Sequence, residues 1–333
     1  MIVLLTDNKK HSVAILMALF NGEHYLREQI NSIIDQDYSD WRLNIRDDVS
    51  TDHSLKVVDG LAAIEKRIII MNDEYGNLGA AKNFGKLIEY ALKLDEAYFC
   101  FSDQDDVWMP DKLVKKLAKL KQLEEKHPGE PVLIHSDMMV VDQKLNMMAS
   151  SFMDYQGIKN ETNSPLEVLL AQNFITGCTV LMNRALLDVA LPIPKDALMH
   201  DWWLALCAAV FGRIGYIDEP LVKYRQHDNN EVGAKRIRDF MNPLSGEWKK
   251  RWLEGKENLF QSMKQAEALA ERIREHDPSN VHLTLVEEYV SLRRASPLER
   301  IKKIQLMGVH AQSSSRQVLL LSRLLLTPKD KCT

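Results

Sequence analysis

The sequence lacks the short glycine-rich motifs that bind nucleotides in many enzymes. A dehydrogenase-type dinucleotide site needs the pattern G-x-G-x-x-G after its first strand, and a P-loop needs G-x-x-x-x-G-K-[ST]. The first strand-like run of this chain ends instead in Phe20-Asn21-Gly22-Glu23-His24-Tyr25, and the P-loop pattern is missing. A phosphate group bound by this chain would therefore need another source of positive charge.

Cysteine is scarce as well. No C-x-x-C pair and no Cys/His spacing of a zinc site occurs among the four cysteines, Cys100, Cys178, Cys207 and Cys332. This pattern excludes a disulfide framework and favours a reducing compartment. The apolar start of the chain, Met1 to Leu5, is cut off by charged residues before it reaches the length of a signal peptide or a membrane span. We expect a cytoplasmic protein.

An excess of basic charge is also missing. The 43 Lys and Arg residues stand against 47 Asp and Glu residues, which gives a net charge of -4. No nucleic-acid partner is therefore expected, and any basic partner surface must be local. The 333 residues are 45% hydrophobic and 27% charged, which suits one large globular domain or a domain with an extension.

Strand-like and helix-like segments alternate in the first part of the chain. The run from Ser12 to Phe20 is apolar throughout, as in strands that are buried on both faces of a parallel sheet. Three further strand-like runs span 41–46, 67–71 and 98–101. This order predicts an α/β fold with a Rossmann-like, mostly parallel sheet flanked by helices. Such sheets bind ligands outside the carboxyl ends of their strands.

Acidic residues follow two of these strands. Asp47-Asp48 ends the second strand, and Asp103-Gln104-Asp105-Asp106 follows the fourth, before a basic helix pattern from Lys112 to Leu123. Carboxylates at one sheet edge repel one another unless a cation lies between them. Mg²⁺ and Mn²⁺ bind to one or two carboxylates and to substrate phosphates. The cluster therefore predicts a site for a metal and a diphosphate, with a solvated acidic turn as the alternative.

Six segments together resemble glycosyltransferase family 2, and in particular its bacterial rhamnosyltransferase-like branch. The resemblance covers about residues 12–232, and its motifs are Ala18-Leu19-Phe20-Asn21-Gly22, Arg46-Asp47-Asp48-Val49-Ser50-Thr51-Asp52, Asn77-Leu78-Gly79, Ser102-Asp103-Gln104-Asp105-Asp106-Val107-Trp108, Thr176-Gly177-Cys178-Thr179 and His200-Asp201-Trp202-Trp203. It implies a GT-A fold, a nucleotide-sugar donor, Mn or Mg as cofactor, and inversion at the anomeric carbon.

The resemblance also implies roles for individual residues. Asp48 would contact the base of the nucleotide, and Asp105 would be the direct metal ligand, with Asp103 as its partner and His227 as a candidate third ligand. The full set of implied donor contacts is Ala18, Phe20, Asn21, Asp48, Asn77, Lys82, Ser102, Asp103, Gly177 and Arg225. Val49 replaces the usual glycine of the second motif, and since valine disfavours positive φ, we expect this turn to keep a negative φ.

Asp201 precedes an apolar helix pattern and has two possible roles. It could cap the first turn of that helix, or it could be the general base that the resemblance implies for an inverting transfer. Trp202 and Trp203 are acceptor candidates, and we expect one to stack on a sugar and the other to fill the core. His135, in an apolar run, is interpreted as a buried structural histidine.

The character of the chain changes near residue 233. Apolar residues recur at helical spacing among many charges, which predicts a helical extension over 233–333 after a GT-A catalytic domain over 1–232. From Pro297 onwards, seven basic residues stand against two acidic ones. This leucine-rich tail could lie on an anionic membrane surface or pack on the catalytic domain.

Together, these features predict an inverting, metal-dependent glycosyltransferase. The donor suggested by the resemblance is dTDP-L-rhamnose, with a UDP-hexose second, and the acceptor a hydroxyl of a growing, lipid-linked cell-surface glycan. A nucleotidyltransferase is a rival hypothesis, but the turn after the first strand lacks the Gly- and Lys/Arg-rich loop that holds a triphosphate. A binding module without activity is the other rival.

Overall fold

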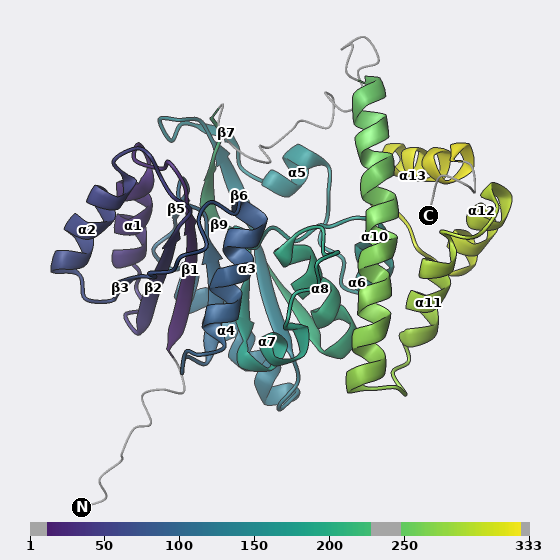
Figure 1. The fold of residues 1–333 in the computed structure, drawn as a ribbon, viewed down its shortest axis with the longest axis horizontal. Helices are drawn as coiled ribbons and strands as arrows, with labels where there is room; N and C mark the ends of the chain where they lie inside the picture. Colours follow the sequence, from purple (N-terminus) through teal and green to yellow (C-terminus); the bar gives the residue numbers. More distant parts are fainter. Residues whose placement is uncertain (1–11, 228–247, 328–333) are drawn as a thin grey trace, which may run out of the picture.

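The computed structural model describes residues 12–227 and 248–327. A nine-stranded sheet forms the centre of the molecule, helices cover both of its faces, and further helices follow at the C-terminal side (Figure 1). The predicted domain boundary near residue 233, and Cys332, Lys329 and Lys331 of the tail, lie outside the described residues.

The N-terminal half of the sheet is parallel, as predicted. Its strands are β1 (Val13–Leu19), β2 (Trp41–Asp47), β3 (Ile68–Ile70) and β4 (Tyr98–Ser102), in the order β3-β2-β1-β4. Between them run α1 (Leu26–Ile34), α2 (Ser54–Ile64) and α3 (Ala80–Ala91). In this register Leu19 pairs with Asp47 and Met17 with Ser102, so the turns after β1, β2 and β4 lie at one edge.

The other half of the sheet is mixed. The short β8 (Leu181–Asn183) pairs antiparallel with β4 and with β6 (Val132–Val141), and β9 (Arg213–Arg225) is parallel to β6. β5 (Val107–Trp108) pairs antiparallel with β9, and β7 (Met147–Ala149) with β6. Thus the prediction of a mostly parallel sheet describes the first four strands, and β6 and β9 add one more parallel pair.

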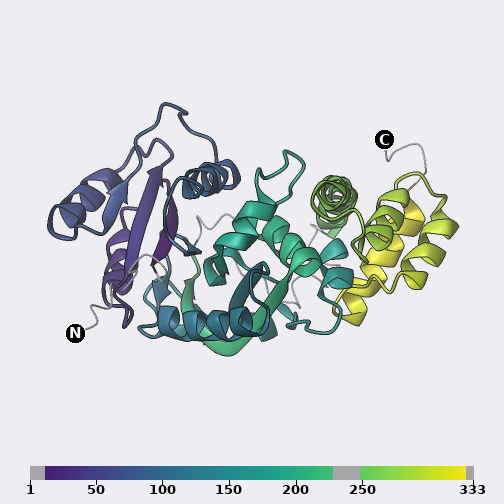
Figure 2. The same ribbon diagram turned by 90° about the horizontal axis from the view of Figure 1, so that it is seen from below.

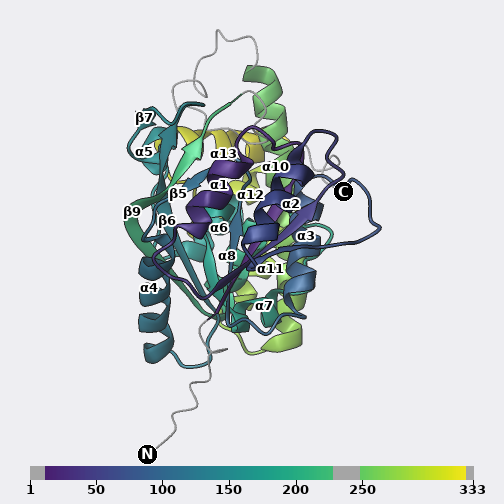
Figure 3. The ribbon, with the colours of Figure 1, turned by 90° about the vertical axis from the view of Figure 1, so that its left-hand side faces the viewer.

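Two apolar cores lie on the two faces of the sheet. Alternate residues of β1 divide between them, because successive side chains of a strand point to opposite faces: Val13 and Ile15 enter one core and Ala14 and Leu16 the other. The first core includes α1, α2 and α4 (Lys112–Lys126), and the second includes α3, α7 (Arg184–Ala190) and α8 (His200–Phe211). Figure 3 shows α4 and α3 on opposite sides of the sheet.

The C-terminal helices continue the second core. They are α10 (Trp248–His276), α11 (Leu283–Ser291), α12 (Pro297–Leu306) and α13 (Ser314–Leu326). Buried α10 residues at helical spacing, Leu259, Met263, Ala266, Leu269, Ala270 and Ile273, belong to the same apolar cluster as α8 and as α6 (Pro165–Ala171). Figure 2 looks along α10, which lies between the sheet and the last three helices. Within the described ranges, no helix combines the length and the apolar character needed to span a membrane.

Candidate active site

A cleft of about 710 Å³ lies at the carboxyl ends of β1, β2 and β4. Its walls include nine residues that the sequence analysis singled out: Ala18, Phe20, Asp48, Asn77, Asp103, Asp105, Gly177, Asp201 and Trp202. Other predicted residues lie outside this lining: Asn21, Lys82, Ser102, Arg225, His227 and Trp203. The carboxylates from the turns after β2 and β4 and from the start of α8 therefore face one shared space.

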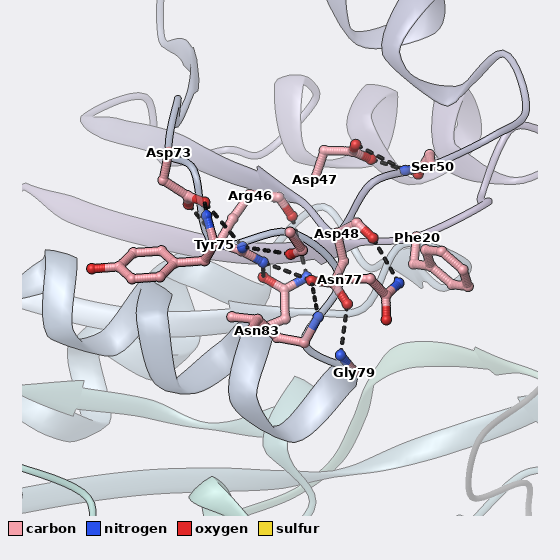
Figure 4. A network of polar contacts seen from close by, with 12 residues as sticks. Phe20, Arg46, Asp47, Asp48, Ser50, Asp73, Tyr75, Asn77, Gly79 and Asn83 are labelled. Atoms are coloured by element: carbon pink, nitrogen blue, oxygen red, sulfur yellow. Dashed lines mark hydrogen bonds and ion pairs between the residues drawn. The ribbon is translucent and has the colours of Figure 1, made fainter.

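Asp48 is fixed at one end of the cleft by the loop that follows β3 (Figure 4). Its buried carboxylate accepts hydrogen bonds from the backbone N-H groups of Leu78 at 2.8 Å and Gly79 at 2.7 Å. The Asn77 side chain donates to the Asp48 carbonyl oxygen at 2.8 Å. These bonds hold the loop against the strand edge and define the wall of the cleft around Asp48 and Asn77.

Arg46 holds several groups at this end of the cleft in place. Its guanidinium, 2% exposed, pairs with Asp48 at 2.8 Å and with Asp73 at 2.7 Å. It also donates to the Asn83 side chain at 3.0 Å and to the Gly76 carbonyl at 3.1 Å. No role was predicted for Arg46 from the sequence. A charged residue within a strand of the predicted core was nevertheless a signal that it makes buried polar contacts.

The turn after β2 differs from the expectation for Val49. Val49 has a positive φ of 67°, so the prediction of a negative φ was wrong. Bonds on both sides fix the turn: Ser50 N and Oγ bond to the Asp47 carboxylate, and Ser50 Oγ accepts from Asn21 N. A strained φ of this kind persists when its surroundings over-determine it.

Further bonds join this turn to the turn after β1. Helix α2 begins later, with His53 as its N-cap residue. Thr51 N donates to the Asn21 side chain at 2.8 Å, and Asn21 itself has a φ of 48°. Asn21 therefore ties the turns after β1 and β2 together instead of lining the cleft.

Gln104 connects the acidic turn to the turn after β1. Its side-chain amide bonds to the Phe20 backbone in both directions, at 2.8 Å and 2.9 Å. A Cβ atom on Gly22 would lie 2.7 Å from Gln104 Cδ, so the glycine is needed for this close approach. The middle residue of the D-x-D pattern thus positions the two aspartates that flank it.

The aspartates that flank Gln104 face the cleft and carry mutually unfavourable charge. Burial and, to a lesser degree, the nearby carboxylates of Asp105 and Asp201 together raise the pKa of Asp103 to about 7. A cation between these groups would lower the pKa again and stabilise the ionised form. The electrostatics of this turn therefore match the predicted metal site.

One group of side chains among the described residues has the spacing of a cation site. Ligand atoms of Asp103, Asp106 and Cys178 lie within 4.8 Å of one another. Burial raises the pKa of Asp106 and that of the Cys178 thiol well above their usual values. Mg²⁺ and Mn²⁺ prefer carboxylate ligands to a thiol, so the aspartates are the better ligands of this group.

Asp105, the predicted direct ligand, is paired with His227. His227 Nε2 lies 2.8 Å from Asp105 Oδ2, and both side chains are partly buried. The His227 ring stacks on Tyr25 at 4.9 Å, and neither ring lines the cleft. Asp103 and Asp105 do line it, and carboxylate oxygens are the ligands that a hard divalent cation prefers.

Arg225 lies beneath the acidic turn. Its buried guanidinium donates to the carbonyl oxygens of Asp105 and Gln143, both at 2.7 Å, and pairs with Glu28 at 2.6 Å. Its backbone N-H donates to Asp106 at 3.2 Å. Arg225 therefore fixes the backbone of the predicted metal ligand through contacts with protein groups.

Asp201 also lines the cleft, from the first turn of α8. It is not the N-cap residue, which is Met199, but it accepts hydrogen bonds from Gly177 N at 2.9 Å and Trp202 N at 2.6 Å. Burial raises its pKa to about 6, against the lowering effect of these bonds. The group is thus ionised at neutral pH and basic enough to accept a proton.

The two tryptophans after Asp201 take different places. Trp202 lines the cleft, and its Nε1 donates to the Leu169 carbonyl at 2.6 Å. Trp203 is fully buried, and its Nε1 donates to the Ala190 carbonyl at 2.7 Å. Of this pair, only Trp202 lines the cleft. His135 is buried and bonds to Asn160, as expected for a structural histidine.

Two lysines without a predicted role support the part of the cleft wall that contacts Asp201. Lys112 and Lys116, one turn apart on α4 and fully buried, donate to the carbonyls of Cys178 and Thr179. These carbonyls belong to the 3-10 turn η2 (Gly177–Thr179), which also gives Asp201 its Gly177 N-H bond. Lysines on the apolar face of a predicted helix were the signal that could have revealed them.

The fold and this cleft define a class of protein, the glycosyltransferases of GT-A fold. The S. aureus TarS 1-349 structure in complex with UDP-GlcNAc matches with a TM-score of 0.52 at 14% identity, over 94% of this chain and 88% of that chain. The mannosyltransferase PcManGT from Pyrobaculum calidifontis, in complex with GDP-Man and Mn2+, matches with a TM-score of 0.50 at 14% identity, over 98% of this chain and 89% of that chain.

Sequence comparison identifies the family to which the chain belongs. The model described as "Glycosyl transferase family 2" matches residues 14–189, and the chain belongs to this family. The dTDP-rhamnosyl transferase RfbG of Shigella flexneri is 31% identical over 233 residues, 66% of this chain and 74% of RfbG. TuaG of Bacillus subtilis, named for teichuronic acid biosynthesis, is 34% identical over 236 residues, 67% of this chain and 82% of TuaG. The protein is thus a glycosyltransferase, and the nucleotidyltransferase hypothesis finds no support.

Proposed function

We propose that this glycosyltransferase inverts the anomeric carbon and takes L-rhamnose from dTDP-L-rhamnose. The observation that carries the proposal is the shared cleft of Asp48, Asp105 and Asp201, each of which comes from a different segment of the chain. The rhamnosyl donor follows the relative RfbG, whose name states that activity. A UDP-hexose is the second candidate, since TarS was solved with UDP-GlcNAc.

The end of the cleft around Asp48 and Asn77 would hold the nucleoside of the donor. Asp48 and the backbone of the loop around Gly79 form that wall, and Phe20, 46% exposed, lies beside it. The diphosphate would then lie at Asp103 and Asp105, and the sugar would point towards Asp201.

Mn²⁺ or Mg²⁺ would be held by Asp105 and Asp103, with His227 behind Asp105. A divalent cation at this position supplies Lewis-acid stabilisation of the charge that develops on the leaving diphosphate. Arg225 and Gln104 keep the two carboxylates in place through the bonds described above. The chain itself thus provides an ordered acidic turn at the point where the donor bond breaks.

The transfer would be a single displacement. A hydroxyl oxygen of the acceptor forms a bond to the anomeric carbon while the bond from that carbon to the diphosphate oxygen breaks. The hydroxyl proton passes to the Asp201 carboxylate, which its pKa of about 6 allows at neutral pH. Attack from the face opposite the diphosphate inverts the carbon, and no covalent enzyme intermediate forms.

The acceptor is proposed to be a lipid-linked glycan at the inner face of the cell membrane. Leu298, Lys302 and Leu306 follow one another at successive turns of α12, and the two leucines are 76% and 77% exposed. On α13, Val318, Leu325 and Leu326 are also exposed. Exposed leucines beside basic residues are typical of helices that lie on anionic lipid surfaces.

We also propose that residues 1–232 are the GT-A catalytic domain and residues 233–333 its helical extension. The extension would then combine two roles on different faces, since α10 packs into the core while α12 and α13 expose leucines. Sedimentation with vesicles containing anionic lipid, with neutral vesicles as the control, tests the lipid contact. Leu298→Asp with Leu306→Asp should abolish sedimentation without changing the melting temperature.

Thermal denaturation with nucleotide-sugars tests the donor assignment. A ligand that binds only the folded state raises the melting temperature in proportion to the logarithm of its concentration over Kd. dTDP-L-rhamnose with Mn²⁺ should raise it most, UDP-hexoses less, and the effect should fall after EDTA. If a UDP-hexose raised the melting temperature more, the donor would be that sugar and not rhamnose. If EDTA left the increase unchanged, the metal would have no part in donor binding.

A further inference from the structure

Arg316 brings a cationic group from the C-terminal extension into the wall of the cleft. It lies in the first turn of α13, far along the chain from the strands that form the rest of the site. Helix α13 lies at the same end of the molecule as α5 (Phe152–Gln156), as Figure 1 shows. In the sequence, Arg316 is one of the seven basic residues of the tail and shows no other sign of a role.

Two backbone carbonyls fix the Arg316 guanidinium at the cleft. Nη1 donates to the Gly157 carbonyl at 2.9 Å, and Nη2 donates to the Gln156 carbonyl at 2.8 Å. Gln312, one turn earlier, bonds to both backbone groups of Lys159. Gln312, just before α13, and Arg316 in its first turn thus attach the start of this helix to the 156–159 segment by four hydrogen bonds, which hold Arg316 in one orientation.

This part of the cleft adjoins the proposed base. Gln312 N donates to the Gln172 side chain at 3.3 Å, and the next residue, Asn173, lies 3.4 Å from the Asp201 carboxylate. Gln172 and Asn173 both line the cleft. A general base must contact the acceptor hydroxyl, so the surface that connects Asp201 to Arg316 is on the acceptor side of the site.

The Arg316 guanidinium has no acidic partner among the residues that the structure describes. Its hydrogen bonds there go to uncharged carbonyl oxygens, and a guanidinium carries five N-H donors. Burial lowers the pKa of Arg316, but an arginine stays charged at neutral pH. Around it the lining is uncharged, with Phe152, Gln156, Ile158 and Gln172 as the neighbouring wall residues.

We propose that Arg316 binds an oxyanion of the acceptor, so that the C-terminal extension selects acceptors that carry negative charge close to the reacting hydroxyl. This inference rests on the proposed function, because it takes Asp201 as the base. A guanidinium binds the oxygens of a carboxylate or phosphate with paired, charge-assisted hydrogen bonds. The apolar surfaces of Phe152, Ile158 and Trp202 suit the faces of sugar rings beside it.

The oxyanion has two possible sources, a uronic acid carboxylate in the glycan or a phosphate of the lipid carrier. Competition with simple probes distinguishes them. Methyl glucuronide carries the carboxylate, glucose 1-phosphate carries the phosphate, and methyl glucoside carries neither. Binding of each probe to the full-length protein is measured by ligand-detected NMR, and inhibition of metal-dependent donor hydrolysis gives a second readout.

The expected result is that at least one anionic probe binds about tenfold or more tightly than methyl glucoside, as charge-assisted hydrogen bonds of this kind allow. Arg316→Gln should remove this preference and leave the Kd of the nucleoside diphosphate unchanged. Arg316→Lys should keep part of the preference, because it keeps the charge but not the paired geometry. The stronger of the two anionic probes identifies the source of the oxyanion.

Arg323→Gln is the matched control. Arg323 lies on the same helix, is partly buried and donates to a backbone carbonyl, that of Arg251, but it does not line the cleft. This variant should keep the full preference. Equal binding of all three probes to the wild type, or an unchanged preference in Arg316→Gln, would contradict the inference.

Two further outcomes separate this inference from the proposed function. Loss of nucleoside diphosphate affinity in Arg316→Gln would assign the guanidinium to the donor diphosphate and overturn the acceptor role. Donor hydrolysis that is absent for every nucleotide-sugar would contradict the proposed function. The NMR binding preference would still test Arg316 in that case, since it does not depend on turnover.

Discussion

Asp201 is both the proposed base and a source of instability. Its folded-state pKa of about 6 lies above the usual value of 3.8, so the folded protein binds this proton more tightly than the unfolded chain does. Below pH 4 the group is protonated in both states and has no effect. Above pH 6 it is ionised in both states, and the cost of burying the carboxylate is fully present.

Asp201→Asn should therefore stabilise the protein at pH 7.5, by about 3 kcal/mol at most, as a shift of about two pKa units implies. The gain should disappear near pH 4. Denaturant unfolding at both pH values measures this change in the free energy of unfolding. The control is Asp59→Asn, at an exposed position of α2, which should change the free energy of unfolding by no more than about 0.5 kcal/mol. An equal gain at both pH values would mean that burial of the charge is not the cause.

Arg46 carries the second residue-level prediction. Its removal would leave Asp48, which is buried, with an unpaired charge, and breaking a buried pair in this way costs about 3–5 kcal/mol. Arg46→Met should lower the unfolding midpoint accordingly and weaken nucleoside diphosphate binding, measured by calorimetry. Arg27→Met, the same change at an exposed position of α1, is the control. Equal stability of the two variants would rule out the organising role of Arg46.

Some of these residues could be predicted from sequence and others could not. Asp48, Asp105 and Asp201 each stand next to a recognisable strand or helix signal, and the order of strands places the first two at one sheet edge. Arg316 and Lys112 act through carbonyl groups far away in the chain. No local pattern encodes such contacts, because they depend on how distant elements pack.

At the scale of elements, the turn η2 joins α4, the wall of the cleft and Asp201. A Cβ atom on Gly177 would lie 3.2 Å from His200 Nε2 and 3.5 Å from the Asp201 side chain. Gly177→Ala should therefore push His200 aside and shift Asp201, the next residue of α8, and so reduce kcat about tenfold or more, since small displacements of reacting groups have effects of this size. A transfer assay measures it, with melting temperature as the check on folding.

Gly60→Ala is the control for this change. Gly60 lies in α2 with open space around its Cα, so alanine should stabilise the helix by about 1 kcal/mol and leave kcat unchanged. If Gly177→Ala behaved like Gly60→Ala, the close contact between η2 and Asp201 would have no role in the reaction.

Elements with strong periodicity were predictable, and short or strained ones were not. β1 and β4 are apolar runs and β2 alternates apolar with polar residues, and the parallel order of the three was predicted correctly. β8 has only three residues, too few to show that it would insert antiparallel between β4 and β6. The positive φ of Val49 contradicts the backbone preference of valine, because bonds from Asp47 and Asn21 outweigh that preference.

At the scale of the whole molecule, one apolar core joins the sheet to the C-terminal helices. Met263 of α10 is fully buried in the cluster that contains residues of β4 and α8. Thermal unfolding should therefore give one cooperative transition in calorimetry, with equal calorimetric and van't Hoff enthalpies. Two separate transitions would show that the extension folds independently of the sheet.

Met263→Ala tests the same coupling by mutation. It should lower the stability of the whole molecule by about 2–5 kcal/mol, the usual cost of a large-to-small change in a core. Loss of nucleotide binding should follow the same curve, since the cleft lies on the shared core. Leu253→Ala, at a position of α10 that is 47% exposed, should have little effect.

The central claim is that Asp201 removes a proton from the acceptor in a cleft that binds the donor independently of it. The most direct measurement compares Asp201→Asn with the wild type in nucleotide-sugar binding and in sugar transfer. The account predicts an unchanged Kd for the donor and a loss of transfer of about 10²- to 10⁴-fold, the usual contribution of a general base. Full transfer by Asp201→Asn would contradict it.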